Sequence, residues 1–522
     1  MANPTAPFHP IIYVRGYAMT QGEIDETTAD PFCGFNLGST VYRATPDKDK
    51  PAKKFIFESP VLRLGSDFGY ADVFKNGLDI MDPDWTGSIP AKSIVIYHYY
   101  EQASTLLGRG KTPGIPVFAK GLSDLSLRVR ALVCQDPNNK IDPEDFRCYL
   151  VAHSMGGLVC RAFLQNPALG EAEARACVDK VFTYATPHNG IEMVGLNVPS
   201  WFNLADMTNF NQKEMAKYLN LEALYKKEDR VDFLPEKAFS SDRFFCMIGT
   251  NRADYEVAMG ASRTFAGHGS DGLVRIENAS VQGVNAKGQM TEPCAKAFAY
   301  RSHSGFFGIV NSEEAYQNLT RFLFGDVRVD IWVDVHEVRL PKGLEKAKGV
   351  NALYQFEVLA SPRGKRWYLT RRVAEEDSVA CCSHEELTDV SQDRPKRLYL
   401  SSMFLDRTQR VDPHRESLAY SLTLGVRVPD YEVDQKFWPN QHYEGGYLFR
   451  DSVVVEIVPP QDEDGDWNVT YDWQSDNLGL ASTPLNPRAL KSGKVELPVP
   501  FESATTPGIR GKLRFVVSAW NV

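Results

Sequence analysis

Hydrophobic residues recur in two different ways along the 522-residue chain, and the change falls near residue 326. Before it, short apolar runs alternate with stretches whose apolar residues share one helical face. The runs predict strands at residues 9–18, 54–58, 93–100, 148–152, 180–186 and 243–250. Helices are predicted at residues 117–133, from 158 onward, and at 312–324, where Asn311 and Glu314 have capping-box spacing. Such alternation is typical of βαβ units with a mostly parallel sheet, whose functional groups gather at the carboxyl ends of the strands.

After residue 326 the pattern becomes strand-like throughout. Apolar and β-branched runs, separated by turn clusters, occur at residues 327–338, 352–359, 366–373, 397–403, 418–428, 452–458, 468–473, 494–499 and 512–520. No convincing helical pattern intervenes, which is typical of an all-β sandwich. The sequence therefore predicts an α/β domain at residues 1–326 and a β-sandwich domain of unknown role at residues 327–522. Two domains also fit a chain longer than one hydrophobic core usually serves.

The most informative stretch is residues 147–165, where an apolar strand stops at the letters HSMGG (153–157) and a helical pattern follows. A serine between a strand and a helix, flanked by small residues, is the nucleophile elbow pattern. Ala152 and Gly156 lie two positions to either side of Ser154, and their small size lets neighbouring backbones approach. Ser154 is therefore the candidate nucleophile.

Two later loops contain the acid and the base that such a serine needs. In the stretch GHGSDGLV (267–274), the glycine after Asp271 lets the chain turn so that the carboxylate faces a histidine. His303 lies between two serines, on a loop just before the last predicted helix. The chain order Ser154, Asp271, His303 is that of the nucleophile-elbow hydrolases. Asp254 and Asp206 are the alternatives for the acid.

A tetrahedral intermediate at this serine would need backbone N–H donors for its oxyanion. One is the N–H of Met155, at the start of the helix, where positive partial charge collects. The second is expected from the loop after the strand at residues 9–18, which breaks at Gly16, with the N–H of Tyr17 as the donor. The alternative is that Gly16 simply ends a strand.

The turn after the strand at residues 180–186 reads TPHNG and contains another histidine, His188. Because His188 precedes Asp271, the chain order favours a structural or substrate-lining role for it. The segment from about 190 to 242 is too long for a plain loop and predicts a cap of short helices. Its apolar side chains line either an acyl pocket or the core of the cap, and the pocket candidates are Trp201, Phe202 and Met207.

Composition and charge exclude several classes of function. The formal net charge of −9 and the lack of a Lys/Arg block argue against a nucleic-acid partner, and no apolar run is long enough to predict a transmembrane segment. The opening residues MANPTAPFHPIIYVRG do not resemble a secretory signal. Nine cysteines, with Cys148, Cys160 and Cys246 inside apolar runs, indicate buried free thiols and a cytoplasmic location. The sequence does not indicate an oligomeric state.

Together, the AHSMGG elbow, the TPHNG turn, the SDGLV acid loop and the HSGF histidine loop resemble the α/β-hydrolase family in its lipase/esterase branch. The resemblance covers residues 8–326. It departs at Ala152, where the elbow usually has glycine, and at Arg15, where the oxyanion loop often has histidine. It implies a serine ester hydrolase with Ser154, Asp271 and His303 as its triad, and with apolar or lipid-like esters as substrates. Transient contact with a lipid surface is an option in this branch. Neither a cofactor nor a metal is implied.

Two alternatives are left open by the sequence. An acyltransferase would use the same triad and differ only in the nucleophile that resolves the acyl-enzyme. A binding or adhesion protein would instead rely on the β-sandwich, with the first domain as a scaffold. A complete serine, acid and histidine in the expected order argues against the second alternative, because a scaffold need not keep all three.

Overall fold

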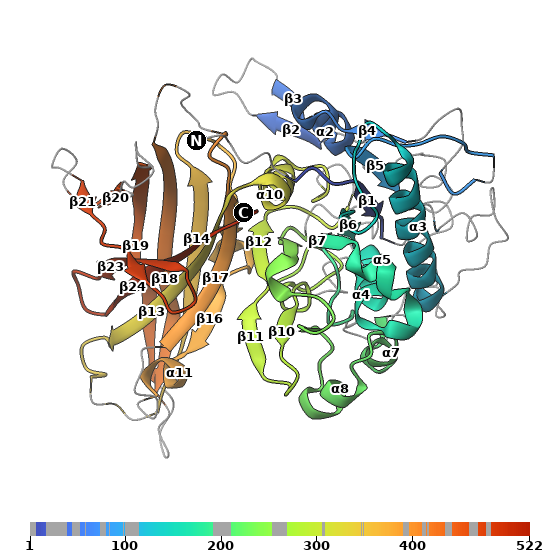
Figure 1. Ribbon diagram of the computed structural model, residues 1–522. Coiled ribbons are helices and arrows are strands. Elements are labelled where there is room, and N and C mark those ends of the chain that lie inside the picture. The colour runs from blue at the N-terminus through green and yellow to red at the C-terminus, as the bar shows by residue number, and fades with distance from the viewer. Residues whose placement is uncertain are drawn as a thin grey trace. The chain divides into compact units, whose positions relative to one another are not determined.

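The computed structural model describes residues 7–16, 39–43, 53–57, 59–73, 80–99, 114–191, 210–252, 269–304, 308–389, 396–409, 414, 417–433, 441–458, 468–476 and 482–521, apart from 83, 98, 346 and 348. The chain divides into two compact units, coloured blue to yellow and yellow to red in Figure 1. The α/β unit contains Pro7–Lys296 and Tyr300–Leu319. The β-rich unit consists mainly of the chain from Thr320 onward and includes Ala297–Ala299.

The α/β unit contains a seven-stranded sheet with the order β12-β9-β7-β6-β1-β5-β4, except for the last three residues of β12. Its strands are β1 (Ile11–Val14), β4 (Ala71–Asp72), β5 (Ser93–Ile96), β6 (Cys148–His153), β7 (Val178–Tyr184), β9 (Phe244–Gly249) and β12 (Ala295–Ala299). Each neighbouring pair from β4 to β9 is parallel. Every residue of β1, β5, β6 and β9 is buried, as expected for parallel strands that are covered on both faces.

The order in which the chain adds strands to this sheet reverses at β1. From β1 the chain adds β4 and β5 on one side, and it then returns to place β6 on the other side of β1. In open α/β sheets, functional groups are assembled at the carboxyl ends of the strands that flank such a switch point. The loops after β1 and β6 are therefore the expected location of a site.

Helices cover the sheet. In Figure 1, α3 (Ile115–Gln135), α4 (Met155–Gln165) and α5 (Ala172–Ala176) are grouped together, and α3 packs against α4. The helix α2 (Pro60–Phe68) is joined to α10 (Glu313–Phe324) by an ion pair between Arg63 and Glu313 and by a hydrogen bond from Tyr316 to Asp67. All residues of α4 are buried, which accounts for its apolar sequence.

Smaller elements complete the α/β unit. An antiparallel pair is formed by β2 (Ser39–Arg43) and β3 (Lys53–Phe57), and a three-stranded sheet by β8 (Phe233–Pro235), β10 (Gln282–Val284) and β11 (Met290–Pro293). The predicted cap lies partly outside the described residues. Its described part contains two short helices, α7 (Gln212–Tyr218) and α8 (Glu222–Glu228).

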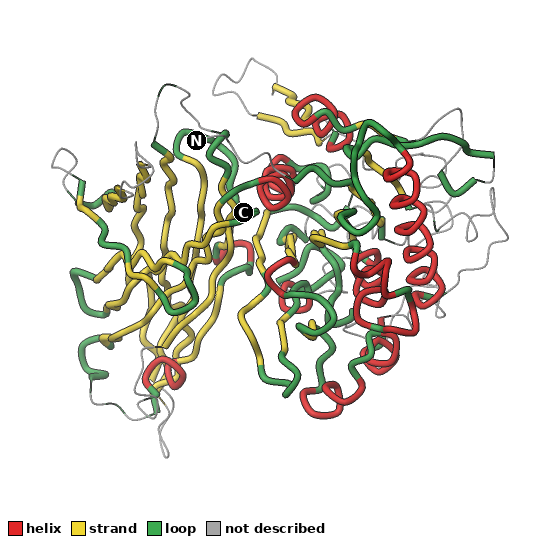
Figure 2. Tube along the Cα trace, viewed as in Figure 1, coloured by secondary structure: helices red, strands yellow, loops and turns green. Residues whose placement is uncertain are grey.

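The β-rich unit consists of two antiparallel sheets. One has the order β17-β13-β24-β23-β22, and the other has the order β15-β14-β18-β19-β20-β21 with β16 paired to β14. The strands are β13 (Val327–Arg339), β14 (Val350–Pro362), β15 (Thr370–Arg372), β16 (Ala380–Ser383), β17 (Lys396–Leu405), β18 (Leu418–Val433), β19 (Gln441–Val458), β20 (Asn468–Trp473), β21 (Thr483–Pro484), β22 (Arg488–Ala489), β23 (Val495–Glu502) and β24 (Gly508–Ala519). Figure 2 shows this unit drawn mainly as strand.

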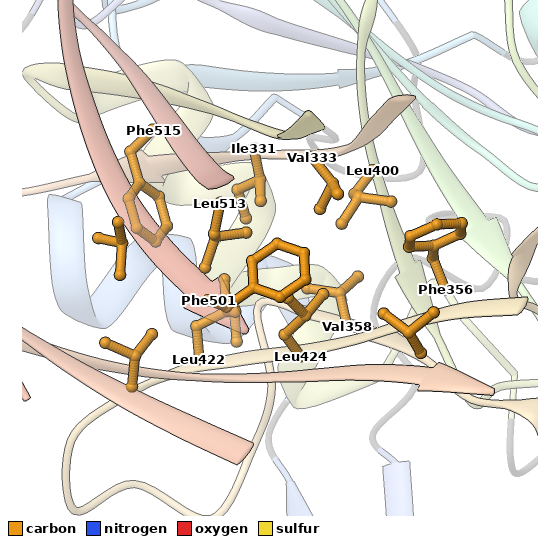
Figure 3. Packing of buried hydrophobic residues seen from close by; sticks show 14 of the residues in the cluster. Ile331, Val333, Phe356, Val358, Leu400, Leu422, Leu424, Phe501, Leu513 and Phe515 are labelled. Atoms are coloured by element: carbon orange, nitrogen blue, oxygen red, sulfur yellow. The ribbon is translucent and has the colours of Figure 1, made fainter. Parts of the chain in front are cut away.

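Side chains from both sheets of the β-rich unit meet in one hydrophobic core. Ile331 and Val333 of β13 and Leu513 of β24 lie near Leu422 and Leu424 of β18, as Figure 3 shows. Alternate residues of β13, β14 and β18 face this core, with the period of two that is expected of strands. Full burial of each such side chain contributes roughly 1.5–3 kcal/mol, so the unit has a substantial core of its own.

The predicted fold class, an α/β unit followed by a β-sandwich, is confirmed. The sequence did not predict α2 or α11 (His384–Thr388). A five-residue helix is too short to show periodicity, and α11 is instead stabilised by a capping box between Ser383 and Glu386.

The sequence predicted buried free thiols at three positions. The structure confirms that they are buried and free at Cys148, Cys160 and Cys246. In the part of the chain that the structure describes, no helix is both long and apolar enough to cross a membrane.

Candidate active site

Ser154 lies directly after β6 and directly before α4. Its backbone has φ 53° and ψ −128°, a conformation that residues other than glycine rarely adopt. Such a conformation costs on the order of 1–3 kcal/mol and persists only where the surroundings enforce it. Two hydrogen bonds hold the turn: the Ser154 N–H donates to the Tyr184 carbonyl (2.9 Å), and the Gly157 N–H donates to the Ser154 carbonyl (3.1 Å).

Glycines make room for this turn. A Cβ atom at Gly156 would lie 2.0 Å from the carbonyl oxygen of Val14, at the end of β1. A Cβ atom at Gly16, in the loop after β1, would lie 2.2 Å from Ser154 Cβ and 3.0 Å from Ser154 Oγ. The loop after β1 therefore lies directly against the serine, and this close approach requires a residue without a side chain.

Three side chains from separate loops meet at this point. His303 Nε2 lies 2.9 Å from Ser154 Oγ, and His303 Nδ1 lies 2.9 Å from Asp271 Oδ2. The exposed fractions are 5% for Ser154, 4% for His303 and 1% for Asp271, so these bonds are shielded from water. An ionised carboxylate only accepts hydrogen bonds, so Nδ1 is the nitrogen that carries the proton. Nε2 is then the acceptor that faces the serine hydroxyl.

The main chain directs the two oxygens of Asp271 to different partners. Oδ1 accepts the N–H groups of Leu273 (3.0 Å) and Val274 (2.7 Å), which leaves Oδ2 for His303. Gly272, with φ 102°, makes the turn between them, as the sequence predicted for the glycine after the acid. The carboxylate is therefore held in place by its own loop as well as by the histidine.

The loop that carries His303 is anchored at the start of α10. Arg301 forms an ion pair with Glu314 in the first turn of that helix (3.0 Å). The predicted capping box is not what begins α10: Ser312 Oγ accepts the N–H of Ala315 (3.2 Å), and Glu314 is used for the ion pair instead. The helix start therefore positions the histidine loop.

His153, which the sequence reasoning did not single out, contacts His303 from the side of the elbow. Its Nε2 lies 2.9 Å from the carbonyl oxygen of His303, and the two ring centroids are 5.0 Å apart. Burial, together with His303 and Arg15, holds the pKa of His153 well below its usual 6.5, so the ring is neutral. A sequence signal existed, because a polar ring at the end of an apolar strand needs a buried hydrogen-bond partner.

Of the two predicted oxyanion donors, Met155 lies in the part of the chain that the structure describes, and its role as a donor stays a prediction. Met155 is the first residue of α4, so its N–H lies at the positive end of that helix, directly after the serine. Tyr17 lies outside the described residues, and its role stays a prediction. Two residues before Tyr17, the carbonyl oxygen of Arg15 accepts a hydrogen bond from the Tyr99 hydroxyl.

His188 has other partners in the structure. Its Nε2 lies 3.2 Å from Thr183 Oγ1, and its ring centroid lies 5.6 Å from that of Phe244. The side chain is fully buried, and burial together with Arg161 holds the pKa of His188 well below 6.5. These contacts fit a structural role, while a role in lining a substrate pocket stays a prediction.

Arg161 of α4 is a second residue that the sequence reasoning missed. It is fully buried and donates to the carbonyl oxygens of His188, Val231 and Phe233, at 2.8 Å each. Burial lowers the pKa of Arg161 to about 10, against the raising effect of Asp232, so the side chain keeps its charge at neutral pH. Arg161 thus ties the turn after β7 and the segment around β8 to the helix that begins at the elbow.

The remaining predicted site residues lie outside the described residues: Trp201, Phe202, Met207 and the alternative acids Asp206 and Asp254. Where the chain is described, no group of three or more His, Cys, Asp or Glu side chains is arranged to hold a metal ion.

No protein-family model matches this chain, and no curated protein sequence matches it. Among solved structures, the chain is similar to the mature form of the lipase BlEst2 from Bacillus licheniformis, with 14% identity and a TM-score of 0.29, over 62% of this chain and 95% of that one. The propeptide form of the same lipase gives 11% identity and a TM-score of 0.30, over 89% and 97%. The chain is also similar to a gene product from Listeria innocua, with 10% identity and a TM-score of 0.24, over 60% of this chain and 93% of that one.

Proposed function

We propose that this protein is a serine hydrolase that cleaves carboxylic esters of apolar or lipid-like character through an acyl-enzyme intermediate. The observation that carries the proposal is the continuous line of contacts from Ser154 to His303 to Asp271, at 2.9 Å each. A serine hydroxyl is a weak nucleophile at its free pKa and needs an adjacent base. Here a buried imidazole lies at hydrogen-bond distance from the serine, and its other ring nitrogen faces a carboxylate.

In the proposed reaction, His303 Nε2 takes the proton of Ser154 as the serine oxygen attacks the ester carbonyl carbon. Asp271 stabilises the imidazolium that forms and fixes its orientation. The N–H groups of Met155 and Tyr17 donate to the oxyanion, and losing one such donor typically costs about 2.7–4 kcal/mol of barrier. His303 then gives the proton to the leaving alcohol. A water molecule, deprotonated by the same imidazole, then attacks the acyl-enzyme. The bond to Ser154 breaks, the acid is released, and His303 returns the proton to the serine oxygen.

The backbone of Ser154 favours an enzyme over a binding protein that relies on the β-rich unit alone. A scaffold gains nothing from a strained serine with φ 53° that is held against a histidine. An acyltransferase would use the same residues, and it differs only in whether water or another alcohol takes the acyl group. The proposed chemistry requires no cofactor or metal ion.

A series of p-nitrophenyl esters, from acetyl to long acyl chains, tests the proposal on the full chain. We expect turnover by the wild type, with a preference for apolar acyl groups. Ser154→Ala should reduce kcat by roughly a millionfold at an unchanged unfolding temperature. A fluorophosphonate probe should label the wild type and not the variant. Turnover retained by Ser154→Ala would remove this serine from the mechanism. Adding an alcohol acceptor and analysing the products separates hydrolysis from acyl transfer.

A further inference from the structure

We infer that His153 is a positioning residue for this reaction: its side chain holds the backbone of His303, and through it the imidazole that faces Ser154. The inference rests on the proposed function, because it gives His153 a role only if His303 is the base. The elbow pattern does not require a histidine before the nucleophile, since it asks only for small residues two positions away.

Both polar backbone groups of His303 are paired, each with a different part of the site. Its N–H donates to the carbonyl oxygen of Asp271 (3.0 Å), and its carbonyl oxygen accepts from His153 Nε2 (2.9 Å). The ring repeats these connections, with Nδ1 at Asp271 and Nε2 at Ser154. The base is therefore tied twice to the acid and twice to the elbow. Two of these four bonds join His303 to the elbow, one with His153 and one with Ser154. Loss of the His153 side chain would leave the bond with Ser154.

His153 is a rigid point from which to hold a loop. It is the last residue of β6, in register with Tyr184 of the parallel neighbour β7, and only 6% of it is exposed. The opposite anchor of the histidine loop is the ion pair between Arg301 and Glu314. A shift of about 1 Å in a catalytic group can cost on the order of a hundredfold in rate, so a second anchor near the reacting atoms matters.

A neutral hydrogen-bond donor is the appropriate partner for the carbonyl oxygen of His303. Among the described residues, His303 and Arg15 are charged or titratable groups that act on His153, and His303 itself contacts Asp271, Ser154 and His153. A lysine or arginine could also donate to the carbonyl, but its charge would oppose the imidazolium that forms on His303. Burial keeps the pKa of His153 well below 6.5, so its ring donates without adding a positive charge.

The test compares His153→Phe, which keeps a ring but loses the donor, with His153→Gln, whose amide nitrogen reaches the position of Nε2. We expect His153→Phe to lower kcat about 10- to 100-fold with KM unchanged, and His153→Gln to restore most of the rate. Without the bond from residue 153, the His303 loop is held less firmly, so we expect a looser hydrogen bond between His303 and Asp271. A looser bond stabilises the imidazolium less. The acid limb of the kcat/KM profile should therefore move to lower pH in His153→Phe.

His384→Phe serves as the matched control, because it removes a hydrogen-bonded imidazole of the β-rich unit (3.0 Å to the Tyr354 hydroxyl), and kcat should not change. If His153→Phe does not fold, His153→Asn replaces it, since its shorter amide does not reach the carbonyl. Wild-type kcat and pH profile in the donor-less variant, or a folded His153→Gln as impaired as His153→Phe, would overturn the inference. In either case an active wild type and an inactive Ser154→Ala would leave the proposed function standing.

Discussion

The two ends of the parallel sheet both gather titratable side chains, but they use them differently. At the carboxyl ends, the serine, histidine and aspartate of the candidate site form a single line of hydrogen bonds. At the amino ends, Asp179 of β7 lies between two cations, 2.8 Å from Lys180 Nζ and 3.3 Å from Arg243 Nη1. Burial raises the pKa of Asp179, but Lys180, His9 and Arg243 outweigh it and the net shift is downward.

A histidine is present at the amino ends as well. The ring of His9, just before β1, lies 5.2 Å from that of Tyr149. Burial lowers the pKa of His9 from 6.5 to about 4, with Asp179 acting against it and Lys180 and Arg147 in the same direction. Like His153 at the other end, this imidazole stays neutral at working pH.

The difference teaches what makes such a cluster reactive. Asp179 is paired with a lysine and an arginine, whose ordinary pKa values lie far above neutral pH, so neither readily passes a proton at working pH. Asp271 faces an imidazole whose charge can change, and it can therefore stabilise a charge that exists only during a reaction. The same residue types thus pair as ions at one end, and at the other end they form the line of contacts on which the proposed proton transfer depends.

Among the changes that test this comparison of the two ends, the largest effect should come from Asp271→Asn. The amide can place an N–H where Oδ2 now accepts, so His303 would favour the wrong tautomer, and kcat should fall by about 10⁴-fold. The matched change at the amino ends, Asp179→Asn, should lower the free energy of unfolding and leave kcat unchanged. Ester turnover measures kcat, and urea denaturation measures the free energy of unfolding, for both variants. Comparable losses of kcat in both variants would abolish the distinction between the ends.

A smaller effect is expected from Gly16→Ala. The new Cβ would lie 2.2 Å from Ser154 Cβ, so the loop or the serine must shift. A shift of this kind should lower kcat on the order of a hundredfold. Gly446→Ala in β19 is the control, because a Cβ there meets nothing within 4 Å. Unchanged ester turnover in Gly16→Ala would show that the loop after β1 does not need its close approach to the serine.

The smallest effect concerns stability alone and comes from His9→Phe. Between pH 6.5 and about 4, the unfolded chain binds a proton at His9 that the folded protein does not, so the free energy of unfolding falls as the pH decreases. Without the His9 imidazole, the free energy of unfolding should decrease less steeply with decreasing pH, while kcat at neutral pH stays unchanged. Urea unfolding at several pH values in this window measures the slope. Identical slopes for variant and wild type would mean that His9 is not excluded from protonation.

The elbow, the acid loop and the histidine loop could be predicted because each is defined by neighbours in the sequence. Ser154 needs small residues nearby and a strand and a helix beside it, and Asp271 needs a turn-forming glycine. The strand and helix periodicities likewise predicted the elements of the α/β unit, since parallel strands buried on both faces appear as continuous apolar runs.

His153 and Arg161 could not be assigned a role in the same way, because their partners are distant in the sequence. The carbonyl that accepts from His153 belongs to residue 303, and Arg161 binds carbonyls at residues 188, 231 and 233. In the β-rich unit, the run predicted at 366–373 contains only the three-residue strand β15, because a local apolar pattern does not say where strand pairing begins.

The φ of 53° at Ser154 means that the folded chain is less stable than it could be at the proposed nucleophile. A glycine would adopt this conformation without penalty, so a search for stability alone would replace that serine. Other contacts of the fold must offset the difference of about 1–3 kcal/mol. Screens that rank variants of this protein only by melting temperature would therefore tend to select against the serine.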